Sequence, residues 1–190
     1  TGCDVRLLQV DVTDRAALAE AFGTHLLPSP MPLAGVFHLA GLLDDAPLSR
    51  LDWARFNTVL SPKVDGSWFL HELTRDLALD HFVVFSSIAS VFGTHGQANH
   101  VAANTFMDAL VAARRADFLP GLSINWGAWG ELGTVVRLGI LDRIRQQGVE
   151  GFDTATGLAV LDRLMASGEG SKVVTRMDWN RMLPILQATA

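Results

Sequence analysis

The chain of 190 residues lacks several features, and each absence excludes a class of function. It contains no tyrosine, so no phenol of this chain can act as a catalytic acid. Its single cysteine, Cys3, rules out an internal disulfide and fits a reducing cytoplasm. No apolar run approaches the roughly 18 residues of a membrane helix, residues 1–6 do not have the composition of a signal peptide, and no basic cluster is present. We therefore expect a cytoplasmic domain that binds neither a membrane nor nucleic acid.

Two further absences concern metals and cofactors. The six histidines do not have the close spacing of zinc ligands, so the sequence predicts no metal site. No G-x-G-x-x-G or comparable glycine-rich loop follows any predicted strand, although such a loop lets backbone N–H groups approach the pyrophosphate of a dinucleotide. The chain therefore carries no recognisable phosphate-binding loop.

Strand and helix patterns alternate along the chain. Hydrophobic residues make up 49% of it, which is enough for one domain with a substantial core over residues 1–190. The patterns predict strands at 5–12, 33–39, 80–85, 121–126 and 172–175, and helices at 15–22, 51–77, 97–115, 135–147 and 154–166. Thr13 and Asp14 should cap the first helix, and Pro62 should kink or divide the second. This alternation predicts an α/β fold with an open, doubly wound parallel sheet.

Five short motifs stand in a fixed order. They are V-F-H-L-A-G-L-L-D-D at 36–45, L-S-P-K-V-D-G at 60–66, F-S-S at 85–87, G-Q-A-N-H-V-A-A-N at 96–104 and S-I-N-W-G-A-W at 123–129. Together they resemble the ketoreductase domains of modular type I polyketide synthases and related fatty acid synthases, in the short-chain dehydrogenase/reductase superfamily. The family pattern G-Q-x-N-Y-x-x-x-N has a tyrosine where this chain has His100.

The resemblance implies a catalytic set of Lys63, Ser87, His100 and Asn104. In the family the serine hydroxyl holds the carbonyl oxygen, the tyrosine donates the proton, the lysine lowers the pKa of the tyrosine and binds the nicotinamide ribose, and the asparagine supports the lysine and a relay water. Taken singly, Ser87 could be a turn serine and Lys63 a solvated helix lysine. Their joint spacing favours one site, because His100 and Asn104 share a helix face and Ser87 ends a strand.

The resemblance also implies a nicotinamide cofactor, which in this family is NADPH. The matching positions are Asp11 and Val12 beside the adenine, Ala40 and Gly41 beside the adenosine ribose, and Lys63, Trp126 and Gly127 beside the nicotinamide. Measured against the family, the chain begins at the third strand. The first two strands and the phosphate loop would lie upstream, so we expect one sheet flank to be uncovered and the cofactor site to be half built.

The implied reaction is the reduction of a β-ketoacyl thioester, tethered to an acyl carrier protein, to the β-hydroxyacyl form. The expected partners are the upstream half of the domain, the carrier protein and the neighbouring synthase domains. Leu43, Asp44 and Asp45 resemble the L-D-D loop of the B-type class, and Phe92 stands where the A-type class has tryptophan. If the domain is active, we expect the D-configured (3R in simple chains) product.

His100 leaves alternatives open. In a working ketoreductase its imidazolium could donate the proton, since imidazole has an unperturbed pKa near 6.5. The ring reaches roughly 2 Å less far than a tyrosine oxygen, so a bridging water would be needed. The second alternative is a pseudo-reductase with a structural role in a synthase. A free-standing short-chain dehydrogenase is a weaker third, because those enzymes place a lysine where this chain has Asn104.

Overall fold

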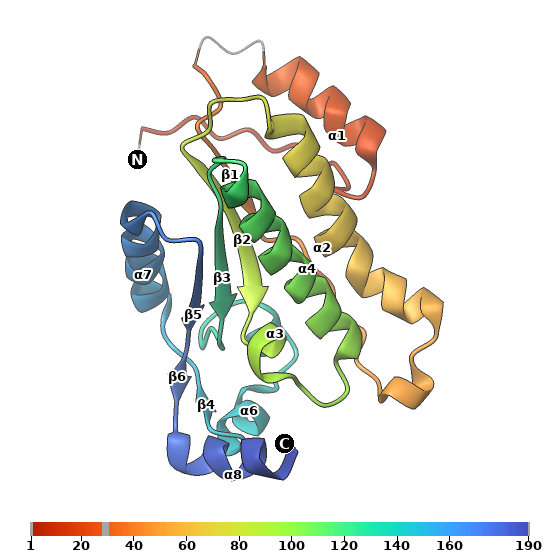
Figure 1. Cartoon of the computed structure of the whole chain (residues 1–190), viewed down its shortest axis with the longest axis vertical. Coiled ribbons are helices and arrows are strands. Elements are labelled where there is room, and N and C mark those ends of the chain that lie inside the picture. Colours follow the sequence, from red (N-terminus) through yellow and green to blue (C-terminus); the bar gives the residue numbers. More distant parts are fainter. Residues whose placement is uncertain (1, 28–30, 190) are drawn as a thin grey trace.

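The main sheet has four parallel strands in the order β1-β2-β3-β5 (Figure 1). The computed structural model describes residues 2–27 and 31–189. The strands are β1 (Gly35–His38), β2 (His81–Ser87), β3 (Leu122–Trp126) and β5 (Ser171–Val174). Because every pair is parallel, the carboxyl ends of the strands meet at one edge, where ligands of open α/β sheets bind.

Helices cover both faces of this sheet, which confirms the doubly wound α/β prediction. One face carries α1 (Arg15–Ala21), α2 (Trp53–Thr74) and α4 (Ala98–Ala116), and α2 and α4 pack side by side (Figure 1). The core there includes Leu18, Val36, Leu70, Phe82 and Met107. The other face carries α7 (Thr154–Ser167), which packs on the buried side chains Val83, Leu122 and Ile124.

The helix starts follow local capping chemistry. Asp14 precedes α1, and its carboxylate accepts hydrogen bonds from the backbone N–H groups of Ala16 and Ala17, as the predicted cap requires. Asp52 caps α2 in the same way through the N–H of Arg55, at 2.9 Å. Pro62 does not divide α2, which runs unbroken over 22 residues. The missing N–H costs one hydrogen bond, and packing of the buried proline and its neighbours on the sheet holds the helix together.

Two predicted elements are wrong. Residues 5–12 form no strand, and Val5 and Leu7 are largely exposed. A strand needs a hydrogen-bonded neighbour, and none of the described strands pairs with this segment. The helix predicted at 135–147 is two short helices, α5 (Thr134–Arg137) and α6 (Leu141–Gln146). Between them Gly139 adopts the left-handed conformation with φ of 64°, which ends a helix.

Several short elements were not predicted. They are η1 (Phe22–Leu26), η2 (Leu48–Arg50), α3 (Ala89–Phe92), β4 (Val149–Glu150), β6 (Arg176–Met177) and α8 (Trp179–Thr189). Strands β4 and β6 pair antiparallel below the main sheet. Two-residue strands are too short to show a period in the sequence.

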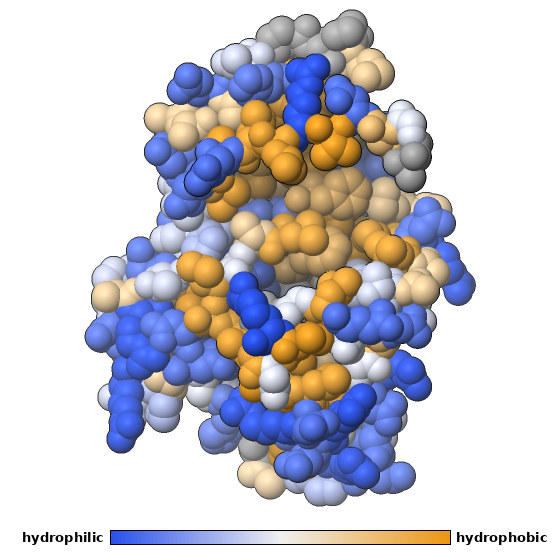
Figure 2. Space-filling view, turned by 180° about the vertical axis from the view of Figure 1, so that it is seen from behind, coloured by the Kyte–Doolittle hydropathy of each residue, from blue (hydrophilic) through white to orange (hydrophobic). Residues whose placement is uncertain are grey.

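No described segment pairs with the outer edge of β1. β1 pairs only with β2 among the described strands. Val36 and His38 are buried under α2, whereas Phe37 is 45% exposed, and Leu39 after the strand is 59% exposed. Alternation places Phe37 and Leu39 on the face opposite α2. Figure 2, seen from behind, shows apolar side chains gathered across the middle of the molecule.

None of the helices in the described part of the chain combines the length and the apolarity that crossing a bilayer requires. Within the same residues, no group of three or more His, Cys, Asp or Glu side chains could hold a metal ion.

Candidate active site

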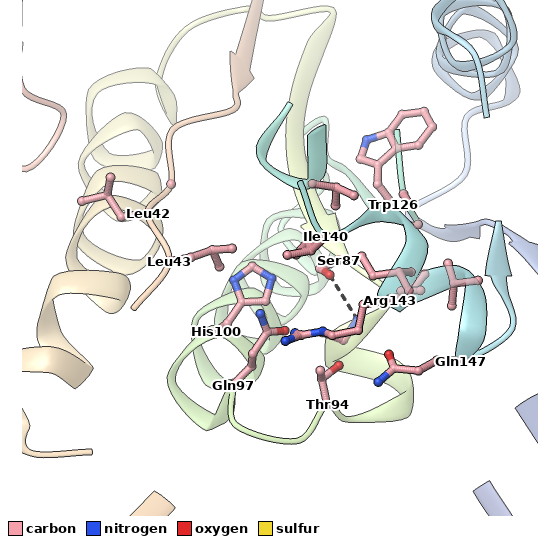
Figure 3. Close-up of a pocket in the computed structure, with 18 of the residues that line it drawn as sticks. Leu42, Leu43, Ser87, Thr94, Gln97, His100, Trp126, Ile140, Arg143 and Gln147 are labelled. Atoms are coloured by element: carbon pink, nitrogen blue, oxygen red, sulfur yellow. Dashed lines mark hydrogen bonds between the residues drawn. The ribbon is translucent and has the colours of Figure 1, made fainter. Parts of the chain in front are cut away.

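A pocket of about 260 Å³ opens at the carboxyl edge of the sheet, beyond β2 and β3 (Figure 3). Six of the predicted site residues line it: Gly41, Lys63, Ser87, His100, Trp126 and Gly127. They come from segments far apart in sequence. The fold therefore brings together the main part of the predicted site, and it does so at the expected end of the strands.

Ser87 is the last residue of β2, and its hydroxyl faces the pocket. Its Oγ accepts a hydrogen bond from the backbone N–H of Ala89 at 3.2 Å, drawn as the dashed line in Figure 3. A hydroxyl has one proton and two acceptor positions, so this contact leaves the proton of Ser87 free to donate. Ser87 can therefore hold a carbonyl oxygen in the pocket.

Lys63 lies inside α2 and is only 7% exposed. Its Nζ donates to the carbonyl oxygen of Phe85 at 3.2 Å. Burial lowers the pKa of Lys63 to about 8, and the negative charge of Asp108 opposes that shift. The side chain also lies directly against Gly41, where an added Cβ would come within 2.9 Å of Cε.

His100 lies in the first turn of α4, partly buried, with its ring at the pocket. Its Nδ1 is buried and has no hydrogen-bond partner among the described residues. Burial, with a smaller contribution from the charge of Lys63, lowers the pKa of His100 to about 4. The imidazole is therefore neutral at pH 7.

Asn104 lies one turn deeper than His100 and does not line the pocket. It is fully buried, and its Nδ2 donates to the carbonyl oxygen of His100 at 2.7 Å. Its Oδ1 is buried without a partner among the described residues. Asn104 thus supports the helix turn that carries His100, from behind the site.

The loop that contains Leu43, Asp44 and Asp45 is tied to the start of α4. Asn99 donates to the carbonyl oxygen of Asp44 at 2.9 Å, and Gln97 donates to the carboxylate of Asp45 at 2.8 Å. The carboxylate of Asp44 is also paired with Arg55 of α2. These contacts fix the loop so that Leu42 and Leu43 form one wall of the pocket.

Three predicted cofactor residues, Asp11, Val12 and Ala40, lie outside the pocket. The carboxylate of Asp11 accepts from the backbone N–H and hydroxyl of Thr13, which lowers the pKa of Asp11. Val12 packs against α2, 3.0 Å from where a Cβ on Gly66 would lie. Ala40 directly precedes Gly41, so the segment runs toward the pocket.

Four of the predicted cofactor residues line the pocket, and their surroundings suit a nicotinamide cofactor. Gly41 leaves room beside Lys63 that a larger residue would fill, and the Lys63 ammonium lies at that point. Gly127 closes tightly on Thr175, and the ring of Trp126 packs with Trp129 and Phe152. Lys63, Trp126 and Gly127 are thus the groups that would hold the nicotinamide end of the cofactor, and Gly41 would lie beside its ribose.

Sequence reasoning missed the far wall of the pocket. It is formed by Ile140, Arg143, Ile144, Gln147 and Val149. Figure 3 shows Arg143 extending from α6 toward His100 and Gln97. The only signal in the sequence was the helical pattern at 135–147 after the fourth predicted strand, and that pattern does not indicate that the helix folds back over the site.

Comparison with known proteins places this geometry in a family. Residues 1–131 match the KR domain family. The chain is 44% identical over 180 residues to the polyketide synthase GfsE of Streptomyces halstedii, covering 93% of this chain and 5% of that protein. It is 43% identical over 182 residues to the mycoketide-CoA synthase of Mycobacterium tuberculosis, covering 93% of this chain and 4% of that protein.

A solved structure of A-type ketoreductases from a modular polyketide synthase is also similar. It superposes with a TM-score of 0.94 at 39% identity, over 98% of this chain and 39% of that one. The chain therefore belongs to the KR domain family, the ketoreductases of polyketide synthases, with the short-chain dehydrogenase/reductase fold. These domains are oxidoreductases. The chain spans only a small share of the length of the synthases that it matches.

The neutral histidines predict acid sensitivity. Burial, assisted by the charge of Lys63, lowers the pKa of both His38 and His100 from 6.5 to about 4. Between pH 6.5 and 4 the unfolded chain therefore binds more protons than the folded chain. The contribution of the two neutral histidines to the free energy of unfolding is complete above pH 6.5 and is lost as the pH falls toward 4. We expect a loss on the order of 3 kcal/mol for each histidine.

The measurement is the midpoint of denaturant-induced unfolding at a series of pH values from 7.5 to 4. His38→Gln should flatten the dependence, whereas a change of the exposed His95 to Gln should leave it unaltered. An equally steep dependence in His38→Gln would contradict the assignment.

Proposed function

We propose that residues 1–190 are the C-terminal, catalytic part of a ketoreductase domain that reduces a carrier-protein-bound β-ketoacyl thioester with NADPH inside a polyketide synthase. The observation that carries the proposal is the meeting of Lys63, Ser87 and His100 in one pocket at the carboxyl edge of the sheet. The product would be the β-hydroxyacyl thioester. The family membership supports the reaction class.

Each residue would have a separate task. Bound beside Gly41 and Lys63, NADPH would supply the hydride that the ketone carbon accepts. The hydroxyl of Ser87, which donates to no group among the described residues, would donate its hydrogen bond to the ketone oxygen. The Lys63 ammonium would bind the ribose hydroxyls and stabilise negative charge that develops on the oxygen.

His100 would act as a neutral hydrogen-bond donor rather than as an acid. Its low pKa leaves almost no imidazolium at pH 7, so the proton that completes the alcohol would come from water. A neutral imidazole still offers one N–H to the developing alkoxide. We therefore propose a slow reductase whose weak point is protonation of the oxygen.

The proposal is tested by following the hydride. The complete domain, with its upstream half restored, would be incubated with a β-ketoacyl thioester and NADPH carrying deuterium at the transferred position. We expect one deuterium at the β-carbon of the hydroxyacyl product. Product without deuterium, or no product above the level without protein, would contradict it.

A catalytically impaired domain with a structural role is the second candidate. It is favoured by the neutral state of His100 and by the absence of a partner for its Nδ1. For an impaired domain we expect NADPH to bind to the complete domain without any turnover. The same labelling experiment therefore distinguishes the impaired domain from the active reductase.

B-type stereochemistry is proposed from the loop at Leu43, Asp44 and Asp45. Its support is that the loop is fixed to α4 and that Leu43 lines the pocket, where it would contact the incoming chain. Chiral analysis of the labelled product should give the D-configured alcohol, and the L-configured alcohol would contradict the assignment.

The upstream half of the domain is the first proposed partner. Support comes from the outer edge of β1, which pairs with none of the described segments, and from the exposed Phe37 and Leu39 beside it. A strand paired there would also carry the phosphate loop toward Gly41. The carrier protein and the neighbouring synthase domains are the other proposed partners.

Gly41 gives a prediction for cofactor binding. In Gly41→Ala the new methyl would lie 2.9 Å from Cε of Lys63 and would displace the ammonium. We expect NADPH to bind about 10-fold more weakly to the complete domain, since a charged hydrogen bond is lost. Titration of NADPH fluorescence would measure this. Gly23→Ala, where no atom lies within 4 Å of the new methyl, is the control. Equal affinities in the two variants would contradict the prediction.

A further inference from the structure

Asp108 lies behind the pocket, on the face of α4 that carries the site. It follows Asn104 by four residues and His100 by eight, which places all three on one side of the helix. Its Oδ1 accepts a hydrogen bond from the hydroxyl of Ser123. Its Oδ2 lies 2.8 Å from both Nδ2 of Asn125 and Oγ of Ser90.

These contacts join the elements that build the site. Ser123 and Asn125 are buried residues of β3, and Ser90 belongs to α3. The Ser90 hydroxyl also lies 2.8 Å from the carbonyl oxygen of Ser87, so its proton is shared between that oxygen and the carboxylate of Asp108. One carboxylate therefore connects α4, β3 and the turn that follows Ser87.

The charge of Asp108 has no cation in direct contact. All three of its hydrogen-bond donors are neutral, and no lysine, arginine or histidine in the described part of the chain forms an ion pair with it. Such an arrangement leaves the negative charge to act on buried cations around it.

One such cation is Lys63, whose charged form the charge of Asp108 favours. It is 7% exposed, and its hydrogen bond goes to a neutral carbonyl oxygen rather than to a carboxylate. The titratable groups that face it are His38 from β1 and His100 and Asp108 from α4. Both histidines are neutral at pH 7, so Asp108 is the negative group that favours the lysine in its charged form.

We propose that Asp108 is a positioning residue of the reductase site: its carboxylate holds α4 against the sheet and is the counter-charge that keeps Lys63 protonated. The role rests on the proposed function, because it matters only if Lys63 serves cofactor binding and reduction. The residue acts through Lys63 and through the helix that carries His100, without contacting the substrate.

The proposal predicts a change in the titration of Lys63. Asp108→Asn keeps the size of the side chain and removes its charge, so the midpoint of Lys63 should fall by about one pH unit from its value near 8. Ser123→Ala removes one hydrogen bond and keeps the charge, so the midpoint should stay within a few tenths of a unit.

The measurement uses the complete domain labelled with ¹³Cε-lysine, with Lys63 assigned by the signal missing from Lys63→Arg. The exposed Lys172 is an internal reference, since its partner Glu169 is unchanged. Asp76→Asn, which removes an exposed carboxylate beside Arg75, is the matched control. None of these readings requires turnover, so a failed reductase assay and a failed titration are distinct outcomes.

A midpoint of Lys63 that falls in Asp108→Asn and not in Asp76→Asn supports the role. An unchanged midpoint in folded Asp108→Asn overturns it. If Asp108→Asn does not fold, the proposal is tested by a pH titration of the unsubstituted domain labelled with ¹³Cγ-aspartate. The signal of Asp108 should then move at the pH where Lys63 loses its proton, and a signal with no such step overturns the proposal.

Discussion

His100→Tyr is expected to raise the rate of NADPH-dependent reduction at pH 7 by roughly 10²- to 10⁴-fold, the usual contribution of a positioned general acid. The reason is the state of the native side chain: its low pKa leaves a neutral ring that can donate a hydrogen bond but has no readily released proton. A phenol reaches roughly 2 Å further into the pocket, and the neighbouring Lys63 ammonium would lower its pKa.

The rate would be measured as NADPH consumption by the complete domain with a β-ketoacyl thioester. His100→Phe fills the position without a donor, and it should be no faster than the native protein. His95→Tyr, at an exposed position, should also leave the rate unchanged. Equal rates for the tyrosine and phenylalanine variants at position 100 would show that protonation is not the weak point.

Ser87→Ala, made together with His100→Tyr, is expected to lower kcat by about 10²- to 10³-fold, the usual cost of losing one donor to a developing oxyanion. Within the described residues the Ser87 hydroxyl donates to no protein group, and its hydrogen bond to the substrate oxygen would strengthen as charge develops there. The KM should therefore change little, because the interaction belongs mainly to the transition state.

The comparison is between His100→Tyr alone and the double variant, with full kcat and KM for each. Ser49→Ala in the same background removes an exposed hydroxyl in η2 and should have no effect. A rise in KM with kcat unchanged would instead make Ser87 a ground-state binding residue.

The sequence predicts the buried parts of the fold well and the exposed edge poorly. β2 and β3 are rich in apolar residues and lie mostly buried between helices, as expected for a parallel sheet covered on both faces. Residues 5–12 have a similar pattern but form no strand, because a strand depends on a neighbour and none of the described strands pairs with this segment. The composition of a segment indicates its tendency to form a strand, but it does not show whether a neighbouring strand is there to pair with it.

The candidate site could likewise be predicted from the sequence only in part. Lys63, Ser87 and His100 could be assigned because motifs fix each to a strand end or a helix face, and the parallel sheet brings those ends together. The positions of Arg143 and Asp108 depend on how later segments fold back on the sheet, which no local pattern encodes. The depth of Asn104 behind His100 also follows from helix packing, and its predicted support of Lys63 and a relay water stays a prediction.

The pH dependence of reduction by the native complete domain tests the central claim most directly. NADPH consumption with a β-ketoacyl thioester would be followed from pH 5.5 to 7.5, below the pKa of Lys63. We expect slow turnover that does not fall through pH 6.5, because His100 is neutral across the whole range. A rate that falls as the pH rises through 6.5 would make the imidazolium the acid, and no turnover at any pH would contradict the reductase itself.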